Sequence, residues 1–253
     1  MNSLIARTIL VLAVAAMCAR AQENQQQAAK INKEGFEQYK LGKFEAAADL
    51  FEKAVATYPK LVVAQFNLGT AYFQLKQFER SCAAFQKVTE LQPDYSLGFN
   101  QLGVVLMELN RNNEALAAFE TAVRLKPSGP VELFNLGAAL VRLNKFKRAV
   151  EVLEQAKQNG ASDAETLIHL GYAYAHTKHY EKAIAEIKKA VELTPDDNEL
   201  RVYLGGLYMA VNNKEAALAQ HRIIELQRPD LAQKLYQRIY NDKLLIVTYD
   251  EIK

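Results

Sequence analysis

Cysteine and excess charge are both scarce in this sequence. It has only two cysteines, Cys18 and Cys82, and Cys18 lies in an N-terminal segment that we expect to be removed. With one cysteine left, an intramolecular disulfide is excluded. The chain has 31 basic and 29 acidic residues, and loss of Arg7 and Arg20 with that segment leaves 29 of each. Proteins that bind nucleic acid usually carry a basic surplus, so we expect no nucleic-acid partner.

Sequence motifs typical of catalytic, metal-binding or phosphate-binding sites are missing as well. The chain has no glycine-rich phosphate loop, no pair of cysteines at metal-binding spacing and no nucleophile motif. We therefore expect no enzymatic activity, no cofactor and no bound metal ion.

What the sequence does contain is a period of 34 residues that repeats six times. Each repeat has a glycine, a small residue twelve positions later and, in all but the last, a large apolar residue four positions after that. A period held this often predicts stacked helical repeats. The glycines are Gly35, Gly69, Gly103, Gly137, Gly171 and Gly205; the small residues are Ala47, Ser81, Ala115, Ala149, Ala183 and Ala217; the large positions hold Phe51, Phe85, Phe119, Leu153, Ile187 and His221.

The spacing also predicts how each repeat is built. Small residues belong where two helices cross closely, and the large residues fill the remaining space. Between the helices, Gly42, Asn110, Asn144 and Asn212 occupy equivalent positions and tolerate the left-handed conformation that ends a helix. Lys76 and Lys178 occupy the same position in the other two repeats, where we expect slight strain.

The pattern resembles the tetratricopeptide repeat, most clearly in Leu68-Gly69, Tyr72, Phe85 and Pro93. The resemblance covers residues 28–229 and implies an all-α, right-handed superhelical solenoid of six helix-turn-helix repeats. Beyond it, Leu231, Leu235 and Ile239 fall at helical spacing. Residues 230–241 look like the extra capping helix that commonly follows the last repeat in this family.

The resemblance also implies where a partner binds. In this family the first helix of each repeat lines a concave groove, and four of its positions face a ligand. Side-chain amides beside them suit a peptide backbone. The alternative is that these aromatic and amide residues partly serve the stacking of the repeats. The implied peptide-binding residues are Val63, Phe66, Asn67, Thr70, Phe73, Leu97, Asn100, Gln101, Val104, Met107, Val131, Phe134, Asn135 and Val141.

One polar cluster suggests a different function. Glu165, His169, Tyr172 and His176 lie at i, i+4, i+7 and i+11 and share one helix face. Glutamate and histidine one turn apart can hold a metal ion, and histidine titrates near neutral pH. A metal- or pH-dependent sensor is therefore one alternative. A zinc site needs three or four close ligands, so we favour a polar patch in a solvent-filled groove.

The N-terminal residues 1–21 read as a signal peptide. Arg7 precedes a run of twelve apolar or small residues, and Ala19-Arg20-Ala21 supplies a cleavage site before Gln22. This run is shorter than the roughly 20 residues a membrane span needs, so no span is expected after cleavage. Lipidation at Cys18 and a retained anchor are the alternatives. Residues 22–27 form a polar leader that we expect to be unstructured.

Together these patterns predict an exported adaptor, periplasmic or secreted, that binds an apolar peptide or helix of a partner protein in the groove. Its size and repeat number resemble those of periplasmic assembly factors, which indicates a function in envelope assembly. The alternative to groove binding is a structural envelope scaffold that uses the convex face. The apolar tail, residues 242–253, is expected to fold back on the terminal helix or the rim of the groove.

Overall fold

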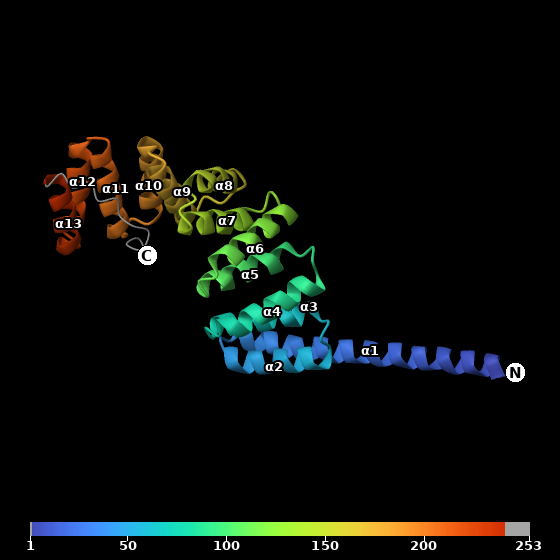
Figure 1. The fold of residues 1–253 in the computed structure, drawn as a ribbon. Helices are drawn as coiled ribbons and strands as arrows, with labels where there is room; N and C mark the ends of the chain where they lie inside the picture. The colour runs from blue at the N-terminus through green and yellow to red at the C-terminus, as the bar shows by residue number, and fades with distance from the viewer. Residues whose placement is uncertain (1, 241–253) are drawn as a thin grey trace. The chain divides into compact units, whose positions relative to one another are not determined.

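The computed structural model describes residues 2–240 (Figure 1). Residue 1 and residues 241–253 lie outside the described part, and so does the predicted docking of the tail. The described residues form thirteen α-helices and no strand, which confirms the all-α fold. The chain divides into two compact units, Met1–Leu125 and Lys126–Lys253.

The N-terminal unit contains three of the predicted helix pairs. Each helix packs against the next one along the chain, and α3 also contacts α1. The helices are α1 (Asn2–Lys40), α2 (Phe44–Thr57), α3 (Val62–Gln74), α4 (Phe78–Leu91), α5 (Ser96–Glu108) and α6 (Asn112–Leu125).

The C-terminal unit contains the other three pairs and one further helix. Consecutive helices again pack together, α9 also contacts α7, and the last helix packs against both α11 and α12. The helices are α7 (Pro130–Arg142), α8 (Phe146–Gln158), α9 (Ala164–His176), α10 (Tyr180–Leu193), α11 (Asn198–Ala210), α12 (Lys214–Glu225) and α13 (Pro229–Tyr240).

Five of the six repeated glycines lie where the two helices of a pair meet, as the spacing predicts. A β-carbon added at Gly103 would lie 2.6 Å from the ring of Phe119, and one at Gly171 would lie 2.7 Å from Ile187. All six small residues of the period are 0% exposed. Ser81 fits among alanines because its hydroxyl donates to the carbonyl oxygen of Gly69 at 2.7 Å, which satisfies the buried polar group.

The turns between paired helices also follow the prediction. The equivalent residue has a positive φ in every pair, including 73° at Gly42, 57° at Asn110 and 64° at Lys178. Asparagine and glycine adopt this conformation at little cost, whereas lysine pays for it because its β-carbon crowds the backbone. Lys76, with φ of 57°, is therefore the second strained position.

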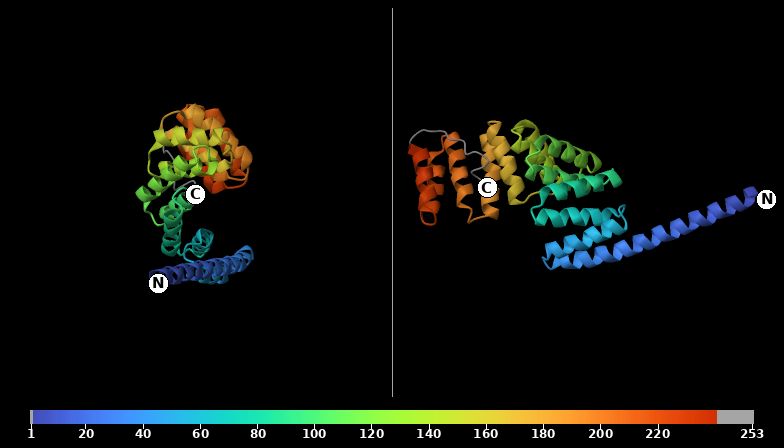
Figure 2. Two further views of the ribbon diagram at one scale, coloured as in Figure 1. Left: turned by 90° about the vertical axis from the view of Figure 1, so that its right-hand side faces the viewer. Right: turned by 60° about the horizontal axis from the view of Figure 1, so that its bottom comes forward.

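The prediction that residues 22–27 are unstructured is wrong. Helix α1 runs without a break from Asn2 to Lys40 and passes through them; its N-terminal part extends beyond α2 in Figure 2. No glycine or proline occurs before Gly35, and glutamine, glutamate and alanine are good helix formers, so nothing stops the helix. Ala28 is the first described side chain that is buried.

The last repeat is completed by the capping helix. His221 replaces the large apolar residue of the period, and Leu235 of α13 lies over Gly205 instead. Leu231, Leu235 and Ile239 are buried in one cluster with Val202 of α11 and with residues of α12. The predicted helix at 230–241 is thus present as α13. Its Leu235 packs against Gly205, where the second helix of each earlier repeat supplies the large apolar residue. Among the residues that the structure describes, no helix has both the length and the apolar character needed to cross a membrane.

Candidate functional site

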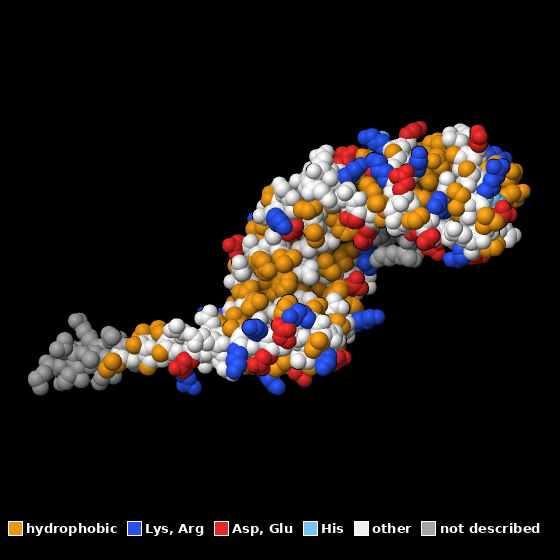
Figure 3. Space-filling view, turned by 180° about the vertical axis from the view of Figure 1, so that it is seen from behind, with side chains coloured by type: hydrophobic (Ala, Val, Ile, Leu, Met, Phe, Trp, Pro, Cys, Tyr) orange, Lys and Arg blue, Asp and Glu red, His pale blue; other side chains and the backbone are white. Residues whose placement is uncertain are grey.

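The first helices of the second and third repeats, α3 and α5, present an apolar face in the N-terminal unit. Val63 and Leu97 occupy equivalent positions in the two repeats and are 48% and 37% exposed. Hydrophobic side chains gather on the face of this unit that Figure 3 turns to the viewer. We call this surface the α3/α5 face. Its other predicted residues are half-buried: Phe66, Thr70, Phe73, Gln101, Val104 and Met107.

The aromatic residues of this face also hold the repeats together. The ring of Phe66 packs edge-on against Phe85 at 5.4 Å and lies 5.9 Å from Tyr95, the residue directly before α5. Phe73 packs against Phe78, the first residue of α4, at 5.6 Å. Such aromatic contacts stabilise the fold by about 0.5–1.5 kcal/mol each beyond area burial. These two phenylalanines therefore contribute to stacking as well as to the surface.

One of the amides predicted to meet a partner's backbone, Asn67, is hydrogen-bonded within the protein. The side-chain nitrogen of Asn67 donates to Oδ1 of Asn32 at 3.0 Å, one repeat earlier. The hydroxyl of Thr70 donates to the carbonyl oxygen of Phe66 at 2.9 Å. Asn100 is only 1% exposed, so it does not belong to the accessible face. The Asn67–Asn32 bond therefore joins two successive repeats, whereas the Thr70 bond lies within α3.

In the C-terminal unit, the predicted groove residues on α7 separate into exposed and buried ones. Val131 is 57% exposed, whereas Val141 is 1% exposed and cannot contact a ligand in this conformation. Phe134 is half-buried and packs edge-on against His169 at 5.5 Å, and Asn135 is half-buried. Of the predicted groove residues on α7, only Val131 is therefore exposed.

The histidine cluster of α9 is a packed aromatic group. His169 and Tyr172 are buried, and Nδ1 of His169 lies 2.9 Å from the carbonyl oxygen of Glu165. His176 stacks on Phe146 of α8 with 4.2 Å between ring centroids and 16° between ring planes, and it also contacts Tyr172. Burial lowers the pKa of His176. No three His, Cys, Asp or Glu residues within the described chain are placed to hold a metal ion, so the metal alternative has no geometric support.

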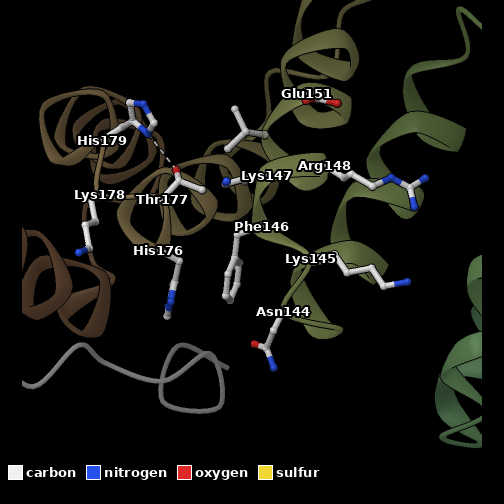
Figure 4. Close-up of a pocket in the computed structure, with 11 residues that line it drawn as sticks. Asn144, Lys145, Phe146, Lys147, Arg148, Glu151, His176, Thr177, Lys178 and His179 are labelled. Atoms are coloured by element: carbon white, nitrogen blue, oxygen red, sulfur yellow. Dashed lines mark hydrogen bonds between the residues drawn. The ribbon is translucent and has the colours of Figure 1, made fainter.

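Beside this aromatic group lies a pocket that sequence reasoning missed. It has a volume of about 780 Å³ and lies between the α7–α8 turn and the α9–α10 turn (Figure 4). The sequence does contain a pattern that could have indicated this pocket. Asn144 and Lys178 are equivalent turn positions in successive repeats, and Lys145, Lys147 and Arg148 follow Asn144. The lining residues are Asn144, Lys145, Phe146, Lys147, Arg148, Val150, Glu151, His176, Thr177, Lys178 and His179.

Comparisons with known proteins identify the architecture. A family model described as the tetratricopeptide repeat matches residues 32–96, 77–130, 100–164 and 134–198. Comparison with curated protein sequences found no match.

Solved structures with the same fold include three that are informative. PilF of Pseudomonas aeruginosa is 17% identical, with a TM-score of 0.70 over 88% of this chain and 99% of that chain. PilW, described as a widely conserved type IV pilus biogenesis factor, is 19% identical, with a TM-score of 0.70 over 83% and 99%. YrrB, described as a tetratricopeptide repeat protein with an unusual peptide-binding site, is 23% identical, with a TM-score of 0.66 over 75% and 99%.

At these identities the structural neighbours establish the fold alone. The family model, in contrast, spans most of the chain, and the structure shows paired helices with the family's glycine packing and turns. This chain belongs to the tetratricopeptide repeat family.

Proposed function

We propose that this protein is an exported, non-enzymatic adaptor whose α3/α5 face binds an apolar segment of a partner protein. The tetratricopeptide repeat is a scaffold typical of protein–protein interaction. The observation that carries the proposal is the pair Val63 and Leu97, which are exposed at equivalent positions of successive repeats. The α3/α5 face also includes half-buried Phe73, Val104 and Met107.

The physical driving force for this interaction is burial of apolar surface. Covering a fully exposed valine or leucine side chain contributes about 1.5–3 kcal/mol, and Val63 and Leu97 are about half exposed, so each would contribute about 1 kcal/mol. Met107 can repack around partners of different shape because its side chain is unbranched and flexible. A contiguous exposed apolar surface usually marks an interaction site.

Export and envelope assembly form the second part of the proposal. Residues 1–21 have the charged, apolar and small-residue regions of a signal peptide. The fold is shared with PilW, a pilus biogenesis factor, and with YrrB, which has a peptide-binding site. These similarities support the proposal that the protein is an assembly factor that recognises a segment of polypeptide.

Site-specific photo-crosslinking in the native host tests the proposed function. A photoreactive amino acid at Val63 or Leu97 should capture one partner, which mass spectrometry then identifies. The matched control is the same amino acid at Ala83, which is exposed on α4, the second helix of the same repeat. Capture from Ala83 but not from Val63 or Leu97 would overturn the proposal and favour a scaffold that binds through its second helices.

A further inference from the structure

We propose that the pocket between the α7–α8 and α9–α10 turns binds an acidic segment of a polypeptide. This would be a second site, separate from the α3/α5 face. It is built from two inter-helix turns, the first two turns of α8 and His176 at the end of α9. None of these residues is at a first-helix position that the family uses for groove binding.

The shape of the pocket suits a peptide side chain or a short turn of chain. Its volume of about 780 Å³ lies within the range of about 300–1,000 Å³ that is usual for ligand pockets. The stacked rings of Phe146 and His176 form one wall of the pocket, and Val150 adds an apolar side chain to the lining. Figure 4 shows the side chains of Asn144, Phe146 and His176 on the same side of the ribbon.

The charge of the lining determines the class of ligand. Lys145, Lys147, Arg148 and Lys178 contribute four positive charges, and Glu151 contributes the single negative one. Among the described residues, no carboxylate makes an ion pair with Lys145, Lys147 or Lys178. A hollow lined by one sign of charge concentrates the field and attracts the opposite charge. The complementary ligand therefore carries several carboxylates.

The N-terminus of α8, at the pocket wall, would assist a carboxylate ligand. Lys145, at the N-cap of α8, makes no side-chain capping bond, so amides of the first helical turn are not satisfied by a cap. The positive end of a helix dipole favours an anion at this place.

The site favours a polypeptide over a small anion because it combines several separate positive charges with apolar side chains. A run of Asp or Glu that includes one aromatic residue would place its carboxylates near the lysines and its ring beside Phe146. Electrostatic complementarity of this kind sets specificity and association rate.

Fluorescence anisotropy with a defined probe tests this inference. The probe is a fluorescein-labelled peptide of six glutamates and one tyrosine, and the control probe replaces the glutamates with glutamines. The full chain should bind the acidic probe and not the neutral one. Lys147→Glu with Lys178→Glu should weaken binding by about tenfold or more, because attraction becomes repulsion.

The control variant is Lys188→Glu with Lys234→Glu, which makes the same change in net charge. Both lysines are exposed in the C-terminal unit, and neither lines the pocket. This variant should retain binding, and so should Val63→Ser with Leu97→Ser, which separates the pocket from the α3/α5 face. Equal binding of both probes, or an equal loss in both lysine variants, would overturn the pocket as an acidic-segment site.

Discussion

Gly205 of α11 lies directly beneath Leu235 of α13. A β-carbon at Gly205 would lie 2.7 Å from both δ-carbons of Leu235, a side chain that is 0% exposed and has little room to move. At the adjacent Gly206, an added β-carbon would meet nothing within 4 Å. The capping helix α13 therefore packs against Gly205 and makes no close contact at Gly206.

These adjacent glycines give opposite predictions for the same substitution. Gly205→Ala should lower the free energy of unfolding by about 1–3 kcal/mol, since overpacking forces α13 away from α11. Gly206→Ala should raise it by up to about 1 kcal/mol, because alanine favours the helix and nothing obstructs it. Urea unfolding followed by circular dichroism measures both. A destabilised Gly206→Ala, or an unaffected Gly205→Ala, would contradict this packing.

The turn after α3 offers a stabilising substitution. Lys76 adopts a φ of 57°, a conformation that costs an L-residue about 1–2 kcal/mol, whereas glycine adopts it freely. Lys76→Gly should therefore raise stability by about 0.5–1 kcal/mol after the entropy of the unfolded chain is included. Lys43 is the matched control, because its φ is −87° and glycine relieves no strain there. Thermal unfolding should show a higher unfolding temperature for Lys76→Gly than for wild type, and no increase for Lys43→Gly. Stabilisation of Lys43→Gly alone would argue against strain at Lys76.

The packing of the repeats could be predicted from the sequence because it depends on contacts between neighbouring helices. Glycine, alanine and the large residues recur every 34 positions, and each contact joins helices that are adjacent along the chain. The sixth repeat shows the limit of this approach. His221 signals that the pattern fails there, but only the structure shows that Leu235 of the next helix fills the space.

The candidate binding residues were predicted less well because accessibility depends on neighbouring side chains. Val63, Leu97 and Val131 are exposed as expected, whereas Asn100 and Val141 are buried at comparable sequence positions. Periodicity assigns a residue to a helix face but does not predict how much of that face the next repeat buries. The basic pocket was missed for a related reason: its residues come from turns and a helix end, where no periodic pattern identifies them.

Removal of the predicted signal peptide should leave the packed repeats intact. The described side chains before Ala28 are all exposed, so cleavage before Gln22 removes no described buried contact. Intact-mass analysis of the exported protein should show Gln22 as the first residue, and a chain lacking residues 1–21 should keep the unfolding temperature of the full chain. A retained residue 1, or added lipid mass on Cys18, would contradict the predicted cleavage.

The pH dependence of stability should include a contribution from His176. Burial disfavours its charged form, so its pKa in the folded protein is lowered from the usual 6.5. Its stabilising contribution is therefore present above about pH 6.5 and is lost as the pH falls through the lowered pKa. The His176→Phe variant keeps a ring over Phe146 and should lose less stability on acidification. An NMR titration that places the pKa of His176 at or above its usual value would exclude this contribution.

The most direct test of the adaptor function is the affinity of the captured partner segment for wild-type protein and for Val63→Ser with Leu97→Ser. These exposed side chains make better probes than Phe66, whose contacts with Phe85 and Tyr95 would confound binding with folding. Titration calorimetry should show affinity lower by about 10- to 100-fold in the variant, since each tenfold step corresponds to about 1.4 kcal/mol. Circular dichroism should show that the variant stays folded. Wild-type affinity at the α3/α5 face should depend only weakly on salt, because apolar burial is not screened. A folded variant that binds as tightly as wild type would contradict the account.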